Sequence, residues 1–233
     1  MSLFNVPINQ LLSSLSPKEY QVLEPHLEEV SLPLGKVLYE LSEPIEFVYF
    51  PNHAMVSLVS IMENGATTEV GMIGNDGMVG IPVFLGGNST TNRAVVQIAG
   101  SAMRMDANIL KTNFRRGGEL QQILLLYTQA FLTQVSQTAT CNRLHSLEER
   151  LARWLLLAHD CALKDELLLT QEYIANMLGT RRASVTVAAG LLQQSGLIQY
   201  SRGKIKILNR SGLQTSACEC YNIVKEEHNR LLA

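Results

Sequence analysis

The sequence predicts an α+β protein whose β-rich first half is joined by one long helix to a winged helix-turn-helix. Between residues 30 and 105, β-branched and aromatic runs such as MVSLVSIM and TTEVGMI are broken by Gly, Pro, Asn and Asp every eight to twelve residues. This texture is typical of an antiparallel barrel or sandwich. No glycine or proline then interrupts the stretch from Gly118 to Leu144, and two short helical patterns followed by a hairpin complete the chain.

Composition and length are those of a globular protein with one or two domains. The 233 residues are 46% hydrophobic and 17% charged, which provides enough apolar side chain for sizeable cores. We expect a cytoplasmic protein without a membrane segment, because no apolar run nears the 18 or so residues of a span and no leader pattern is visible. We divide the chain into residues 1–116, 117–145 and 146–233.

The central stretch, residues 117–145, predicts a long helix that associates with a second copy. Leu120, Leu124, Tyr127 and Phe131 recur at four, three and four residues, the spacing of a coiled-coil seam. A helix of some 25 residues is roughly 38 Å long, too long for one small barrel to cover. The stripe therefore predicts a homodimer; in the alternative, this helix lies on its own domain.

A further helix is expected from residue 147 to residue 158. Leu151, Trp154 and Leu155 fall on one face at helical spacing, which predicts a buried side. On the same periodicity Arg153 is expected on the solvent side.

The first helix of the helix-turn-helix is predicted just after Thr170, which is a suitable cap residue. Its inner face carries Ile174, Ala175 and Leu178. Gly179 fits the tight turn that follows, because glycine adopts positive φ without strain.

The second helix is predicted over residues 180–194. Val185, Ala188 and Leu192 form its buried face at helical spacing. Residues 197–200 and 204–208 flank an SRGK turn as a hairpin, the expected wing.

The charge pattern around this unit predicts binding to double-stranded DNA. Six basic and no acidic residues lie in 181–210, although the whole chain has a net charge of −2. The amino-terminal end of such a helix reaches the base edges, where arginine pairs with guanine, so Arg182 is the leading candidate for base readout. The wing would lie along the phosphates. The alternative is a protein-interaction module. The predicted DNA-binding residues are Thr170, Gln171, Arg181, Arg182, Ser184, Thr186, Arg202 and Lys204.

The order of a β-rich domain, a long helix and TQEYIANMLGTRRASVTVAAGLLQQSGLI with a basic hairpin resembles the Crp/Fnr family of dimeric transcription regulators. The resemblance covers nearly the whole chain and is strongest over residues 145–208. It implies a cyclic-nucleotide-binding-like β-roll or jelly roll as sensor domain, a dimerisation helix, a winged helix-turn-helix, and RNA polymerase as a partner. The recognition helix departs from the family pattern: Arg182 matches the first arginine, but Ala183 and Val187 replace a glutamate and a second arginine. The operator sequence therefore cannot be transferred.

The sensor domain also departs from the cyclic-nucleotide-binding members. In these a Gly-Glu pair holds the ribose and a later arginine holds the cyclic phosphate. Gly80 and Arg93 fit the outer positions and are the possible effector-binding residues, but Ile81 replaces the glutamate. Ile81 cannot accept a hydrogen bond from a ribose hydroxyl, which disfavours cyclic AMP. A cyclic nucleotide, another small effector of unknown identity and no effector all stay open.

Cysteines and histidines predict neither a metal nor a cofactor. The Fnr-type iron–sulfur arrangement is missing because no cysteine precedes Cys141, and Cys218 and Cys220 lack a CxxC spacing. We expect reduced thiols, with a redox-active thiol as the alternative. The five histidines form no HxH or HxxxH pair, and no phosphate-binding glycine loop or nucleophile elbow occurs. The protein is therefore not expected to be an enzyme.

Overall fold

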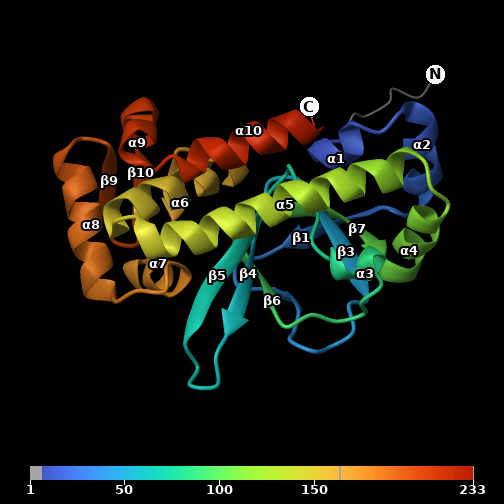
Figure 1. Cartoon of the computed structure of the whole chain (residues 1–233), viewed down its shortest axis with the longest axis horizontal. Helices are drawn as coiled ribbons and strands as arrows, with labels where there is room; N and C mark the ends of the chain where they lie inside the picture. The colour runs from blue at the N-terminus through green and yellow to red at the C-terminus, as the bar shows by residue number, and fades with distance from the viewer. Residues whose placement is uncertain (1–6, 163, 233) are drawn as a thin grey trace.

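The computed structural model describes residues 7–162 and 164–232. Figure 1 shows a β-rich lobe and a smaller helical lobe, with the long helix α5 (Glu119–Leu144) running across both. The β-rich lobe is the predicted sensor domain and keeps that name below. It starts with α1 (Gln10–Ser13), α2 (Pro17–Leu23) and a 3-10 turn (Glu24–His26). Its strands are β1 (Glu28–Leu32), β2 (Val37–Tyr39), β3 (Phe47–Pro51), β4 (Met55–Ile61), β5 (Thr67–Ile73), β6 (Arg93–Ile98) and β7 (Gly100–Asp106).

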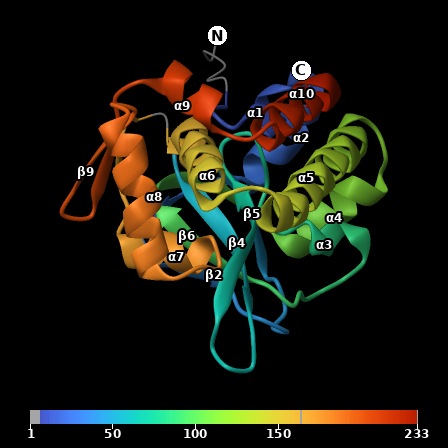
Figure 2. The same ribbon diagram turned by 60° about the vertical axis from the view of Figure 1, so that its left-hand side comes forward.

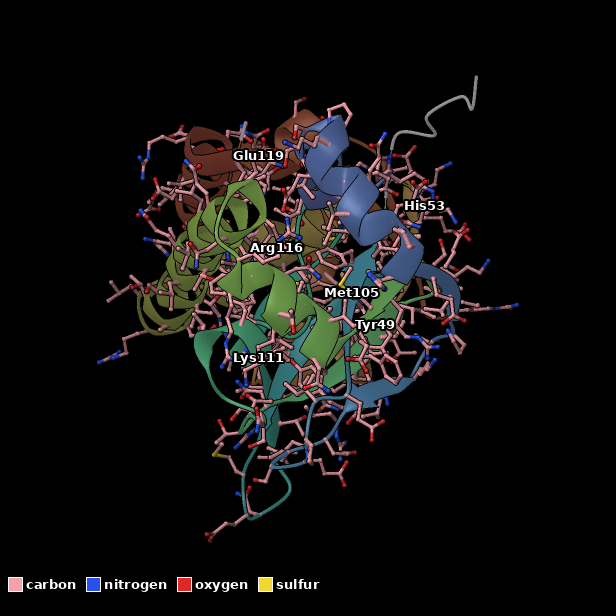
Figure 3. The ribbon with its side chains drawn as sticks, turned by 90° about the vertical axis from the view of Figure 1, so that its right-hand side faces the viewer. Tyr49, His53, Met105, Lys111, Arg116 and Glu119 are labelled. Carbon is pink, nitrogen blue, oxygen red and sulfur yellow. The ribbon has the colours of Figure 1, made fainter. Side chains whose placement is uncertain are left out.

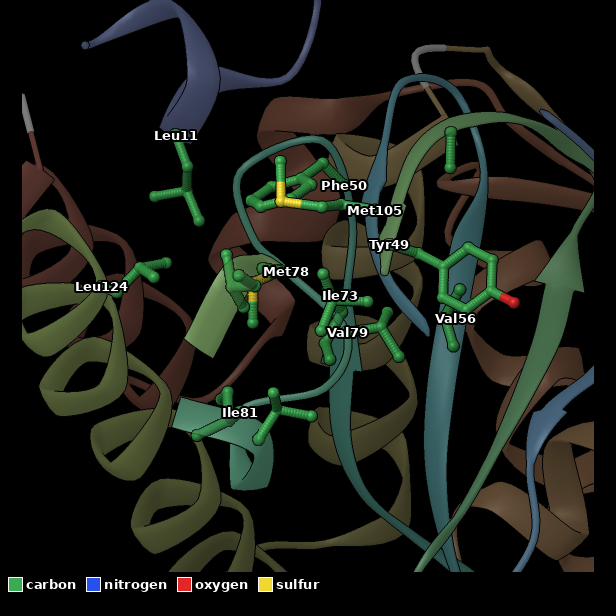
Figure 4. Close-up of a cluster of buried hydrophobic side chains, with 14 of the residues drawn as sticks. Leu11, Tyr49, Phe50, Val56, Ile73, Met78, Val79, Ile81, Met105 and Leu124 are labelled. Atoms are coloured by element: carbon green, nitrogen blue, oxygen red, sulfur yellow. The ribbon is translucent and has the colours of Figure 1, made fainter. Parts of the chain in front are cut away.

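These seven strands form two antiparallel sheets, in the orders β1-β7-β3 and β2-β6-β4-β5. Alternation of buried side chains along the strands encloses one core between the sheets, which includes Phe50, Val56 and Met105 (Figure 4). The short helix α3 (Pro82–Leu85) leads from β5 towards β6, and α4 (Ala107–Arg115) follows β7. The predicted α+β class with a β-roll is confirmed.

Helix α5 has nearly the predicted extent. The prediction that its apolar stripe forms a dimer seam is wrong. Leu120, Leu124 and Tyr127 are at most 3% exposed and belong to the sensor core, and Phe131 packs against it. The hydroxyl of Tyr127 donates to the carbonyl of Met78 (3.0 Å). The start of α5 is tied to the amino-terminal helices, because the Glu119 carboxylate, labelled in Figure 3, accepts the backbone N–H of Ser16 (2.8 Å). The helix therefore lies on its own domain along this face.

The helical lobe contains α6 (Leu147–Ala162), β8 (Glu166–Leu168), α7 (Gln171–Met177), α8 (Arg182–Gln194), β9 (Ile198–Ser201), β10 (Lys204–Ile207), α9 (Arg210–Ser216) and α10 (Cys220–Leu232). Helix α6 extends four residues beyond the predicted end, because Cys161 and Ala162 are still buried. The expected exposure of Arg153 is wrong, since its side chain is buried (4% exposed). Helix α10 lies alongside α5, as Figures 1 and 2 both show.

The two lobes share a hydrophobic core. Met55, Val59 and Met72 of β4 and β5 pack with the buried residues of α6, α7 and α8 rather than with the sensor core. The carboxylate of Glu69, on β5, accepts hydrogen bonds from the indole N–H of Trp154 on α6 (2.8 Å) and from the hydroxyl of Ser57. Burial raises the pKa of Glu69 to about 7. A buried polar contact therefore links the sensor sheet to the helical lobe.

Within the described ranges, no helix combines the length and the apolar composition needed to cross a membrane.

Candidate nucleic-acid interface

Helix α7 begins as the sequence predicts. The hydroxyl of Thr170 accepts the backbone N–H of Tyr173 (3.1 Å), which satisfies one of the free donors at a helix start. Ile174, Ala175 and Leu178 are buried. Gly179 then has φ +59°, and the N–H of residue 180 bonds back to the carbonyl of Ala175 (2.9 Å). The tight turn between the two helices therefore depends on this glycine.

Helix α8 begins at Arg182, two residues later than predicted. Arg181 has an extended backbone and occupies the cap position, so the chain is not yet helical at residue 180. Val185, Ala188 and Leu192 are buried against α6 and α7, as their spacing predicts. The packing of this face fixes the orientation of the opposite one.

The opposite face of α8 is exposed and basic at its amino-terminal end. Arg181, Arg182, Ala183 and Thr186 are exposed, and Val187 has 65% of its surface exposed. Neither arginine forms an ion pair within residues 7–162 and 164–232, and the first turn contains no acidic residue. The positive end of the helix dipole adds to the two guanidinium charges. This end of α8 therefore has the charge and the free donors that an anionic, hydrogen-bonding ligand requires.

Two hydrogen bonds connect this helix to its neighbours. The hydroxyl of Thr186 donates to Oε1 of Gln171 on α7 (2.8 Å), so two of the predicted contact residues are in contact with each other. The amide oxygen of Gln193 accepts the backbone N–H of Tyr200 on β9 (2.7 Å). Gln193 and Tyr200 line a groove between α7, α8 and β9 together with Gln171 and Thr186. The sequence analysis missed both, although Gln193 is seven residues after Thr186 and therefore on the same helix face.

The wing is a two-stranded hairpin as predicted. Arg202 and Gly203 form its two-residue turn, with φ of +47° and +80°, the conformation that matches the twist of paired strands. The carbonyl of Gly203 accepts the N–H of Leu169 (2.9 Å), which holds the tip beside the start of α7. Lys204 is exposed but lies 2.9 Å from the carboxylate of Glu166 on β8. Of the two predicted wing cations, Lys204 is therefore paired.

Of Gly80 and Arg93, the possible effector-binding residues, Arg93 already has an acidic partner. Nε of Arg93 donates to the Glu40 carboxylate (2.9 Å). Gly80 has φ +114°, and an added Cβ would lie 2.8 Å from a methyl group of Val48. Ile81, beside it, is 8% exposed and belongs to the sensor core (Figure 4).

The family comparison agrees with the local geometry of the helical lobe. Residues 149–216 match the model of the Crp-like helix-turn-helix domain. This segment is a Crp-like helix-turn-helix domain. A comparison with curated protein sequences finds no match.

Solved structures share this fold over most of the chain. FixK2 from Bradyrhizobium japonicum is similar with a TM-score of 0.68 and 18% identity, over 82% of this chain and 98% of that one. TTHA1359, a CRP/FNR family transcriptional regulator from Thermus thermophilus, has a TM-score of 0.67 and 23% identity, again over 82% and 98%. The c-di-GMP responsive global regulator CLP from Xanthomonas campestris has a TM-score of 0.63 and 14% identity, over 82% and 99%. The chain therefore has the Crp/Fnr fold, with the Crp-like domain at its carboxyl end.

Proposed function

We propose that the protein is a sequence-specific, DNA-binding transcription regulator of the Crp/Fnr type, in which α8 enters the major groove. One observation carries this proposal: Arg181 and Arg182 stand exposed and free of ion pairs, among the described residues, at the amino-terminal end of a helix whose other face is buried. Arginine at that end pairs with two acceptors of guanine. Thr170, Gln171, Ser184 and Thr186 supply hydroxyl and amide groups beside it, and Arg202 and Lys204 of the wing reach the adjacent phosphates.

We further propose a homodimer, through a different face of α5 from the one that the sequence predicts. Leu125, Thr128, Leu132, Val135 and Ala139 follow one another at three, four, three and four residues, the spacing of a coiled-coil seam. Leu125 is 48% and Leu132 59% exposed in the single chain. A pair of helices joined here places two Crp-like domains about a two-fold axis, so the operator is expected to contain two inverted half-sites about one helical turn apart.

Selection of duplexes from a random pool, followed by binding measurements at several salt concentrations, tests the DNA proposal. We expect an enriched inverted repeat, and an affinity that falls steeply with salt because several phosphates are neutralised. A pool without enrichment, together with binding that is insensitive to salt, would instead indicate a protein-interaction module.

Sedimentation at micromolar concentration tests the dimer. The variant Leu125→Glu/Leu132→Glu should sediment as a monomer, because four carboxylates would meet in the seam. Leu34→Glu, at an exposed loop position outside α5, is the matched control and should stay dimeric. A wild-type monomer would contradict the proposal. Contact with RNA polymerase and action in the cytoplasm belong to the same proposal, as the resemblance to the Crp/Fnr family implies.

A further inference from the structure

Three cysteines and a histidine converge where α5 ends and α10 begins. Cys141 and His145 come from the last turn of α5 and its cap, Cys218 from the segment before α10, and Cys220 from the first position of α10. One Nδ1, Nε2 or Sγ atom of each lies within 4.8 Å of the others. The Sγ atoms of Cys141 and Cys218 are 3.4 Å apart, and Sγ of Cys220 is 3.6 Å from Nδ1 of His145. Four potential ligand atoms therefore surround one point.

The geometry of the backbone explains this convergence. Residues 141 and 145 are four apart on a helix and lie on the same face. Cys218 and Cys220 lie at the start of α10, and they meet the end of α5 because α10 lies along α5. All three cysteines are at most 4% exposed. Because Cys141 and Cys218 are 77 residues apart in sequence, no short motif reveals the cluster.

The histidine has the environment that metal-binding histidines have. While Nδ1 faces Cys220, Nε2 of His145 lies 3.3 Å from the carboxylate of Glu219. In metal sites the second ring nitrogen usually donates to a carboxylate or carbonyl, which fixes the tautomer and makes the ligand more basic. Glu219 lies between the two cysteines in sequence, so the same segment supplies two ligands and this partner.

A buried positive charge stands beside the cluster. Arg153 is 4% exposed, and its Nε and Nη1 atoms have no hydrogen-bond partner among the described residues. Its Nη2 atom donates to the hydroxyl of Thr138 on α5 (3.2 Å). The nearby Glu69 has its pKa raised to about 7 by burial and supplies only part of a counter-charge near neutral pH. An uncompensated buried guanidinium is costly, so an anionic group bound at the neighbouring cluster would offset this cost.

We propose that Cys141, His145, Cys218 and Cys220 bind one Zn²⁺ ion in a tetrahedral Cys₃His site. At Zn–S distances of about 2.3 Å, sulfur atoms at the corners of a tetrahedron are about 3.8 Å apart, within about 0.4 Å of the 3.4 and 3.6 Å of the two close pairs. An iron–sulfur cluster places its ligands on different irons, and so needs a wider set. Three thiolates and Zn²⁺ carry a net charge of −1, which Arg153 balances. Binding forms three Zn–S bonds and one Zn–N bond and releases the three thiol protons to solvent, with no oxidant required.

Such a site would stabilise the junction between the long helix α5 and the Crp-like domain. It joins the end of α5, directly before α6, to the start of α10, which returns along α5. Structural zinc sites with four protein ligands stabilise the fold that brings the ligands together. The zinc site does not depend on the DNA proposal, since its readout is metal content.

Elemental analysis of the full chain, purified under reducing conditions without chelator, tests the proposal. We expect about one zinc per wild-type chain, and less than a tenth of that in Cys218→Ser and Cys220→Ser. Cys161→Ala removes a buried thiol outside the cluster and should retain zinc. Glu219→Gln keeps all four ligands, and should weaken zinc binding about 10-fold or more through the histidine.

A second measurement is independent of whether the variants fold. Wild-type protein stripped with a chelator under reducing conditions is titrated with Zn²⁺, and separately with Co²⁺, whose visible spectrum reports tetrahedral thiolate coordination. Uptake of one equivalent, with a rise in melting temperature, supports the site. Failure of reduced protein to take up either metal would overturn it. A native Cys141–Cys218 disulfide, found by mass spectrometry in protein without zinc, would overturn it as well.

Discussion

The arginines of the recognition helix and the arginine of the sensor domain stand in opposite electrostatic surroundings. Arg181 and Arg182 are exposed and lack an acidic partner in the part of the chain that the structure describes. Arg93, the arginine predicted from the resemblance to bind an effector, is paired with Glu40. A surface ion pair is weak, but it removes the free charge that would attract an anion. The difference teaches that the proposed DNA face is open to a polyanion, whereas the predicted effector-binding arginine already has a counter-charge within the chain.

The largest expected effect comes from removing both free arginines. Arg181→Ala/Arg182→Ala should weaken binding to the selected operator about 1,000-fold, about 4 kcal/mol, because each arginine paired with guanine contributes about 1–3 kcal/mol. Fluorescence anisotropy with the operator and with a scrambled duplex measures this, and the preference between the two should shrink. Arg115→Ala, at an exposed position on α4, is the control. Unchanged operator affinity in the double variant would show that the open charge is not the DNA contact.

The second largest effect concerns the buried hydrogen bond between Trp154 of the helical lobe and Glu69 of the β-rich lobe. The folded protein raises the pKa of Glu69 from its ordinary 4.5 to about 7, so the folded state binds this proton more tightly than the unfolded state. Its contribution to stability is therefore full below pH 4.5 and is lost as the pH rises towards 7 and above, by roughly 3 kcal/mol. In Glu69→Gln this part of the pH dependence should disappear.

Urea unfolding between pH 4.5 and 8 provides the measurement for Glu69. Glu63→Gln removes an exposed carboxylate from the turn after β4, and should leave the pH profile as in the wild type. If Glu69→Gln retains the wild-type pH dependence, then Glu69 is ionised in the folded protein and the contact is not a protonated one.

Whether a sequence prediction was confirmed depends on how far apart in the sequence the interacting residues are. The cap at Thr170, the turn at Gly179 and the apolar face of α8 could be predicted because each depends on residues within one or two helical turns. The seam on α5 was wrong because periodicity shows that Leu124 faces something apolar, but not whether this is a second copy or the chain's own sensor core. The prediction for Arg153 was wrong for the same reason, since its partners come from other elements.

The candidate sites divide along the same line. The free arginines of α8 are visible in the sequence as a local charge cluster without acidic neighbours. The pairing of Lys204 with Glu166, and the convergence of Cys141 with Cys218, result from contacts between residues 38 and 77 positions apart. No local pattern encodes them.

A smaller effect is expected in the wing. Its two cations differ in the same way, because Lys204 already has an acidic partner and Arg202 is not paired with it. Glu166→Gln removes the carboxylate 2.9 Å from Lys204, and should raise the affinity for all duplexes two- to threefold, within the ~0.2–1 kcal/mol of an exposed ion pair. Lys204→Ala should lower the affinity for operator and scrambled duplex alike. Anisotropy at low salt measures both, with Glu226→Gln on α10 as the exposed control. A loss of affinity in Glu166→Gln would mean that the pair positions the wing rather than masking its charge.

The smallest effect is expected at Arg93, and it is the most direct way to break the comparison. Because Arg93 is held by Glu40 and Ile81 replaces the ribose-binding carboxylate, calorimetric titration of the wild type with cyclic AMP or cyclic GMP should give no saturable heat. Arg93→Ala should leave the operator affinity within about 0.5 kcal/mol of the wild type, as for a surface substitution. Saturable heat at micromolar nucleotide that Arg93→Ala abolishes would show that the nucleotide displaces Glu40. The sensor position would then be latent rather than closed, and the ion pair with Glu40 would be the barrier that the ligand must overcome.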